Sequence, residues 1–157
     1  LFLSLTISTN NEIKELLMGI ETEIILGEQK KADLFSRIAE GCARDIKTTD
    51  KGFNKDNNKS TQIRKFYDEL SMWNDRVQLN RTNREAEFKK QEPFIRMLKA
   101  KVAYAEGRKH INNKFSTVFN RCIDQIKNAD TLKEAKLFME AVIAYCKLEE
   151  TRGEKGE

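Results

Sequence analysis

The sequence has few of the residues on which most catalytic and metal sites depend. Its 157 residues include one histidine, His110, and three cysteines, Cys42, Cys122 and Cys146. A single histidine excludes a multi-histidine metal site, and the cysteines lack the C-x-x-C spacing of structural zinc. Three widely spaced cysteines among apolar residues indicate reduced, buried thiols in a cytosolic protein. We expect His110 to be a surface residue at the start of a helix.

Proline, glycine and long apolar runs are also scarce. The chain has one proline and seven glycines, and no apolar run approaches the roughly 20 residues of a membrane-spanning helix. It has no glycine-rich phosphate loop, and its opening LFLSLTIST lacks the flanks of a signal peptide. Because the first residue is not methionine, we expect the start to be truncated or altered. These absences predict a protein that is not an enzyme and uses no cofactor or metal.

Charge is unevenly distributed along the chain. The net charge is +4, yet residues 59–127 carry 16 Lys and Arg against 8 Asp and Glu, whereas both flanking segments have a small acidic excess. A basic block between two acidic ends is typical of a protein that meets a polyanion with part of its surface. By charge alone, a solvated charged face explains the pattern equally well.

Apolar residues recur at helical spacing through most of the chain, which predicts an all-α fold, a compact bundle of five to six helices. The expected helices cover residues 11–26, residues 32–47, four to five turns from Ser60 or Thr61, residues 92–106, residues 109–127, and a last helix after residue 128. Residues 82–91 either extend the third helix or form a short one. We expect the polar segment 47–60 to be a mobile loop.

Helix ends and domain limits follow from local chemistry. Pro93 suits the first turn of the helix at 92–106, where its missing N–H costs nothing. The last helix is predicted to begin with Asp130 or Thr131 as its cap, and its apolar body LFMEAVIAYC places it centrally or in an interface. We expect a helical N-terminal extension at residues 1–31, a helical domain at residues 32–150 and a disordered tail at residues 151–157.

The helices of the basic block carry the candidate binding residues. In STQIRKFYDEL, residues 60–70, two cations lie one turn into an amphipathic helix. On the helix at 92–106 an aromatic and two cations share one side, and further cations lie on an adjoining strip. These side chains are Met97, Lys101, Tyr104 and Arg108, beside Arg96 and Lys99. Cations interleaved with an aromatic suit a phosphate backbone, although solvated helices often carry the same pattern.

The order of four segments is more informative than any one of them. STQIRKFYDEL is followed by PFIRMLKAKVAYAEGR, FSTVFNRCIDQI and FMEAVIAYCK. In this order they resemble the small subunit of the type III-A CRISPR effector, the Csm complex. The matching positions are Thr61, Ile63, Arg64 and Lys65, then Leu98, Ala103, Tyr104, Gly107 and Arg108, then Glu140, Ala141, Ala144 and Tyr145. The resemblance covers residues 59–150, is weaker at 32–47, and does not extend to residues 1–31.

The resemblance implies a non-catalytic, all-helical protein of antiviral defence. Several copies would stack along the filament of backbone subunits that carries the guide RNA, and would line the channel in which target RNA pairs with the guide. Its partners would be guide RNA, target RNA, other Csm subunits and copies of itself, with a homodimer as one form of the isolated protein and no membrane contact. Because base pairing supplies sequence specificity, such a subunit needs to hold only phosphates and sugars.

We therefore predict sequence-independent RNA binding by seven cations and assign Tyr104 a structural rather than a stacking role. The seven are Arg64, Lys65, Arg96, Lys99, Lys101, Arg108 and Lys109. Alternatively, Arg64 and Lys65 pair with Asp68 and Glu69, and Arg108 caps the last carbonyls of its helix.

Two alternatives concern the whole protein rather than single cations. The protein could be a helical adaptor that bridges protein subunits without touching nucleic acid. It could also self-associate through its last helix, in which case a polar change at Val142 would weaken the dimer.

Overall fold

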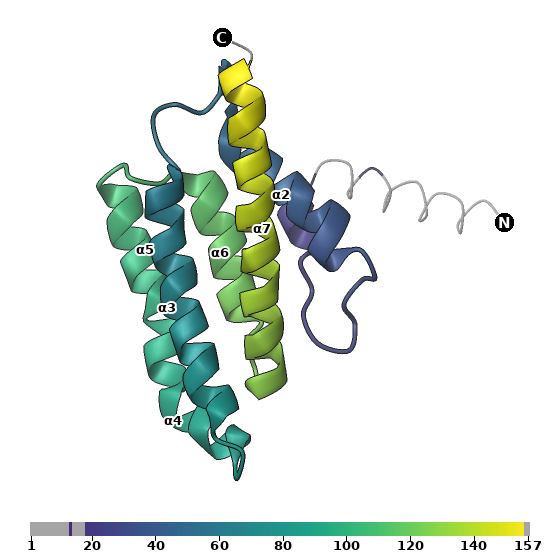
Figure 1. The fold of residues 1–157 in the computed structure, drawn as a ribbon, viewed down its shortest axis with the longest axis vertical. Helices are drawn as coiled ribbons and strands as arrows, with labels where there is room; N and C mark the ends of the chain where they lie inside the picture. The colour runs from purple at the N-terminus through teal and green to yellow at the C-terminus, as the bar shows by residue number, and fades with distance from the viewer. Residues whose placement is uncertain (1–12, 14–17, 156–157) are drawn as a thin grey trace, which may run out of the picture.

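The computed structural model describes residue 13 and residues 18–155, and within these residues the chain is almost wholly helical (Figure 1). The predicted all-α class is confirmed. The elements in chain order are the 3-10 turn η1 (Ile20–Glu23), the π-helical turn η2 (Leu34–Ile38), α2 (Ala39–Lys47), β1 (Thr48–Thr49), β2 (Gly52–Phe53), α3 (Ser60–Leu79), α4 (Arg84–Arg96), α5 (Leu98–Gly107), α6 (Asn113–Asp124) and α7 (Ala129–Lys155).

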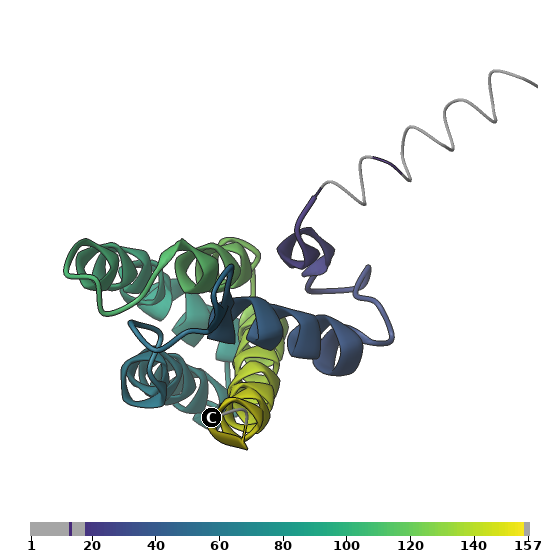
Figure 2. The same cartoon turned by 90° about the horizontal axis from the view of Figure 1, so that it is seen from above.

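The longer helices run alongside one another, and α2 lies across them. Seen from above, α3 and α7 are neighbours, and the α4–α5 pair and α6 form the row behind them (Figure 2). α3 packs against α4 and α7, α5 packs against α6, and α2 packs against α7 and α6. The helix α7 therefore contacts both rows and α2, as expected from its nearly all-apolar body.

One hydrophobic core joins these helices. At one end Phe66 of α3 and Phe115 and Phe119 of α6 form an aromatic cluster with ring centroids 5.6 to 5.7 Å apart. Val142 of α7 is fully buried in the same core. A polar change at Val142 would therefore disrupt the fold itself, so it cannot serve as the probe of self-association that the sequence suggested.

All three cysteines are free and buried, as predicted. Burial raises the pKa of the Cys42 and Cys146 thiols to about 12, and it also raises the pKa of Cys122. Thiols held protonated in this way are poor nucleophiles and poor metal ligands. The cysteines therefore serve as small apolar side chains.

Of the predicted helix at 11–26, residue 13 is helical, residues 18–26 do not continue it, and residues 11–12 and 14–17 lie outside the described residues. Residues 18–26 form only the η1 turn followed by extended backbone, in which Ile24 and Leu26 are buried. The amides of Leu26 and Gly27 donate to the side chains of Gln125, at 2.9 Å, and Glu134, at 2.6 Å. Because these side chains satisfy the backbone, the segment buries its apolar residues without a helix.

The segment at 47–60 lacks a helix, as predicted, but it is anchored rather than loosely attached. Its short strands pair in antiparallel register. Asn54 and Asn58 are buried, and Asn58 adopts a left-handed φ of 54°. The Asn58 amide group donates to the carbonyl of Ile46, at 3.0 Å, and to Oδ1 of Asn112, at 2.6 Å. We expected a mobile loop because a polar sequence alone does not show that these asparagine side chains are buried.

Pro93 does not begin a helix, which corrects the predicted boundary. It lies in the last turn of α4, and the break falls at Met97, before α5. Because proline has no N–H, α4 lacks one backbone bond there, and burial of Ile95 holds the turn in place. Phe94, expected in the core, is 53% exposed.

The last helix is longer than predicted at both ends. The Asn128 side chain accepts from the amide of Thr131 at 2.8 Å, so Asn128 is the cap instead of Asp130 or Thr131. The helix continues to Lys155, so the expected disordered tail is not found in residues 151–155, and residues 156–157 lie outside the described range. A Cβ at Gly153 would lie 2.6 Å from the Phe53 ring, so glycine there lets the hairpin pack on α7.

Candidate nucleic-acid interface

Cations from α3 and α5 meet at one end of the bundle. The amide of Asn58, just before α3, donates to the carbonyl of His110 at 3.0 Å, and the amide of Asn112 donates to Oδ1 of Asn58 at 2.9 Å. The start of α3 therefore lies beside the end of α5. The cations carried there are Arg64, Lys65, Arg108 and Lys109, which we call the α3–α5 cation cluster.

The four members of this cluster have no acidic partner in the described part of the chain. All four are exposed, and the side chains of Arg64, Lys65 and Lys109 make no hydrogen bond or ion pair with any described residue. Arg108 donates to the Tyr104 hydroxyl at 3.3 Å, and its guanidinium lies 5.8 Å from the centre of that ring. The alternative pairings, with nearby acids or with the carbonyls of α5, are not formed.

Arg64 and Lys65 lie on different flanks of α3. Arg64 borders a hollow of about 290 Å³ between α3 and α7, together with Ile143 and Lys147. Lys65 lies one turn before Glu69, which faces α5. Successive residues of a helix are about 100° apart, so the two cations present donors to different parts of a bound backbone.

Arg96, another predicted RNA ligand, is engaged at the end of α6. Its guanidinium donates to the carbonyls of Ile126, at 2.7 Å, and Ile123, at 3.3 Å. Ile123 lies in the last turn of α6 and Ile126 lies two residues beyond its end, so Arg96 binds the chain where α6 ends. This contact gives Arg96 a structural role that its spacing in the sequence did not reveal.

Lys99 and Lys101 each form an ion pair with a neighbouring helix. Lys99 binds Asp124 of α6 at 2.5 Å, and Lys101 binds Glu69 of α3 at 2.6 Å. All four side chains are between 35% and 55% exposed, and pairs so exposed contribute about 1 kcal/mol or less. A phosphate could therefore replace either carboxylate at small cost.

Tyr104, for which we expected a structural role, lies outside the buried core. It is 67% exposed, and its hydroxyl and ring contact Arg108. Two further aromatic residues that the sequence placed in core stripes lie near the same surface. Trp73 is only half-buried, and it stacks on the exposed Phe94 with ring centroids 5.7 Å apart. The alternation of apolar positions could not reveal this, because a half-buried aromatic residue keeps the same helical spacing.

Two other kinds of site were sought in the described residues. No group of three or more His, Cys, Asp or Glu side chains is placed to hold a metal ion there. None of the described helices combines the length and apolar character that crossing a bilayer requires. His110 is exposed, as expected, but it lies in the turn between α5 and α6 and not at the start of a helix.

A family model described as Csm2 Type III-A matches residues 29–152. The match includes all seven predicted cations and most of the described helical structure. No curated protein and no solved structure matches the chain.

Proposed function

The chain belongs to the Csm2 Type III-A family, and from this premise we propose that it is a non-catalytic small subunit that binds guide and target RNA through their backbones and stabilises the effector filament. Membership of the family supports partnership with other Csm subunits. RNA contact and association with further copies of the chain are our proposals. The observation that carries RNA contact is the α3–α5 cation cluster, which is exposed, lies in the first turns of α3 and just after α5, and has no acidic partner among the described residues.

The cluster has the chemistry that sequence-independent RNA binding requires. Arg64 and Arg108 each present a planar guanidinium that can donate two parallel hydrogen bonds to a phosphate, and Lys65 and Lys109 supply mobile point charges. Phosphate contacts position a nucleic acid without reading its bases. The backbone of α3 holds Arg64 and Lys65 in place, and hydrogen bonds to the last turn of α5 hold the backbone of Arg108 and Lys109, so binding needs little reordering of the backbone.

Salt dependence provides the direct test of backbone binding. If all four cations contact phosphates of single-stranded RNA, log K against log salt concentration should have a slope of about −2.8. Affinity would then fall about fiftyfold between 50 and 200 mM salt. Fluorescence anisotropy with two RNAs of unrelated sequence measures the slope, and the two should bind equally.

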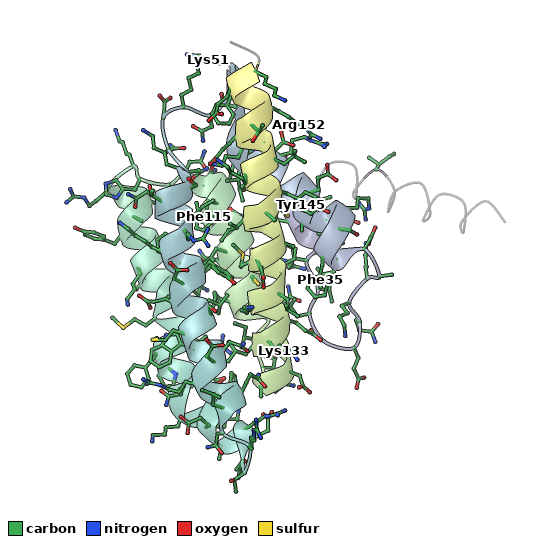
Figure 3. All side chains as sticks on the ribbon, in the orientation of Figure 1. Phe35, Lys51, Phe115, Lys133, Tyr145 and Arg152 are labelled. Carbon is green, nitrogen blue, oxygen red and sulfur yellow. The ribbon has the colours of Figure 1, made fainter. Side chains whose placement is uncertain are left out.

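A double charge reversal, Arg64→Glu with Lys65→Glu, should weaken RNA binding at least tenfold and make the slope less steep, because two phosphate contacts become repulsive. The matched control is Lys133→Glu, an exposed cation near the other end of α7 from Arg152 (Figure 3). The control should bind RNA as the parent does. Circular dichroism and the melting temperature verify that each variant is folded.

Two results would overturn the proposal. One is RNA binding that does not depend on salt or that the double reversal leaves unchanged. The other is co-purification with Csm subunits after RNase treatment with no RNA crosslink at the cluster, which would establish the protein-bridging alternative.

A further inference from the structure

An exposed aromatic surface follows the line along which α3 meets α4 and α5. Trp73 of α3 and Phe94 of α4 lie with their rings nearly parallel, at an interplanar angle of 14°. Phe94 is 53% and Tyr104 is 67% exposed. Ten residues, or about 15 Å of helix, separate these two rings. We call the surface formed by Trp73, Phe94, Met97 and Tyr104 the aromatic seam.

Core packing accounts for only part of the seam, because the half-buried Trp73 packs against the core while the other three side chains are more than half exposed. Ile95, Leu98 and Val102 fill the core positions of α4 and α5, and each is at most 1% exposed. Phe94 and Met97 flank the break between these two helices and project outside that core, with Met97 56% exposed. Large apolar side chains gathered on a surface indicate a binding site.

Cations accompany the rings along the seam. The guanidinium of Arg76 lies 5.2 Å from the centre of the Trp73 ring, and that of Arg108 lies 5.8 Å from the centre of the Tyr104 ring. Lys101 lies between these positions and neutralises Glu69. The seam is therefore apolar and positively charged, which complements a ligand with flat rings and a negative backbone.

The indole N–H of Trp73 lies beneath the seam. Its nitrogen is shielded from solvent and has no hydrogen-bond acceptor among the described residues. Phe94 stacks on the Trp73 ring and Arg76 lies beside it. The ring faces open to a bound base are therefore those of Phe94 and Tyr104, and Trp73 supports Phe94 from below.

We propose that the aromatic seam is a stacking platform for unpaired bases of single-stranded RNA whose backbone is held by the α3–α5 cation cluster. The proposal rests on the proposed function, because the Tyr104–Arg108 contact joins the seam to the cluster. Stacking is tolerant of sequence, since every base has a ring face, so it agrees with sequence-independent binding.

The chain has a single tryptophan, so its fluorescence reports on the seam directly. The test titrates the full chain at low salt with a short oligouridylate and, separately, with an abasic oligomer of the same length and sugar-phosphate backbone. Oligouridylate should quench Trp73 and bind at least about fivefold more tightly than the abasic oligomer. The abasic oligomer should bind without quenching.

Two variants locate the stacking. Phe94→Ala and Tyr104→Ala should each weaken oligouridylate binding about fivefold or more and leave abasic binding unchanged. Both rings are more than half exposed, so the fold should survive their removal. Leu79→Ala is the control, because Leu79 is an apolar residue of α3 that is 76% exposed and lies outside the seam.

Each result separates stacking from backbone binding. Equal, salt-dependent affinity for both oligomers without quenching would overturn stacking and leave the proposed function standing. No binding of either oligomer at low salt would overturn both. Quenching by a second copy of the chain or by another Csm subunit, but not by oligouridylate, would show that the seam is a protein interface and would overturn the stacking proposal.

Discussion

Lys109 shows how a single residue can combine strain with a candidate role in binding. Its φ is 63°, in the left-handed region that non-glycine residues rarely occupy, and its side chain is exposed. The backbone turns here because the amide of Lys109 donates to the carbonyl of Glu106 at 2.9 Å. The sequence predicted a helix that ends at residue 106, and α5 ends one residue later, at Gly107, with the left-handed residue two positions beyond.

Lys109→Gly should therefore stabilise the fold while weakening RNA binding. Glycine adopts a left-handed φ without steric cost, so we expect a gain of about 1 kcal/mol and a melting temperature about 2 to 4 °C higher. The control, Lys109→Ala, removes the same charge but keeps the strain. Both variants should lose the same RNA affinity. If Lys109→Ala is as stable as Lys109→Gly, the left-handed φ at this position is not strained.

The sequence located the cations of the basic block, but it could not predict which of them contact other helices of the same chain. The periodicity of α5 grouped Lys101, Tyr104 and Arg108 on one face. In the structure Arg108 contacts Tyr104, and Lys101 pairs with Glu69 of α3. Helical spacing cannot show that Arg96 reaches the carbonyls of Ile123 and Ile126 at the end of α6, because that contact depends on how the two helices pack. Contacts of this kind belong to the tertiary fold.

At the scale of elements, the η1 and η2 turns are joined by ion pairs. Glu23 of η1 accepts from Arg37 of η2 and from Lys31, each at a shortest distance of 2.9 Å. The hydrogen bonds from Arg37 and Lys31 lower the pKa of Glu23 from 4.5 to about 2, and the bonds of Arg37 to Glu23 and Asp33 raise the pKa of Arg37. Because the folded pKa is lower than the unfolded one, the stabilisation is complete above about pH 4.5 and is lost as the pH falls toward 2.

Glu23→Gln should lower the melting temperature at pH 7 by about 2 to 4 °C, since partial exposure weakens the pairs. The difference from the parent should shrink as the pH falls from about 4.5 toward 2, where the parent also loses the charge. Calorimetry at several pH values in this range measures the difference in melting temperature. Glu28→Gln, at an exposed acid nearby, is the control and should change little. A difference that stays constant with pH would show that the pairs do not stabilise the fold.

Elements with a regular apolar stripe were predictable, and those shaped by tertiary bonds were not. The stripes of α3 and α6 correctly placed Leu70 and Phe119 in the core. The helix boundary predicted at Pro93 was wrong because proline occurs more often in the first turn of a helix than in the last. The packing of α4 overrides that preference. The prediction of a helix at 18–26 was wrong for another reason. The side chains of Gln125 and Glu134 accept hydrogen bonds from backbone amides of this segment, and neither residue is near it in sequence.

At the scale of the whole molecule, one buried lysine joins three elements at the end that carries the cation cluster. Lys47, at the end of α2, is 2% exposed. Its Nζ donates to the carbonyl of Asn58, at 2.6 Å, and to Glu150 of α7, at 2.7 Å. The pair therefore fixes the start of α3 against α2 and α7. Nothing in the polar stretch around Lys47 distinguishes it from its solvated neighbours, so the sequence could not reveal this contact.

Glu150→Ala should destabilise the fold by about 3 kcal/mol, because it leaves the Lys47 ammonium buried without a counter-charge. Adding Lys47→Met should recover much of this loss, since no buried charge then remains. Urea denaturation of the two single variants and the double variant measures the coupling. The control is Lys147→Ala, because Lys147 is 73% exposed and lies 3.7 Å from the same carboxylate.

The same variants connect stability with binding. If the Lys47–Glu150 pair positions the start of α3, Glu150→Ala should weaken RNA binding under conditions in which the variant is still folded, and the double variant should restore binding together with stability. Lys147→Ala should leave the free energy of unfolding nearly unchanged. Equal destabilisation by Glu150→Ala and Lys147→Ala, or full RNA affinity in a destabilised Glu150→Ala, would show that the buried pair does not organise this end of the bundle.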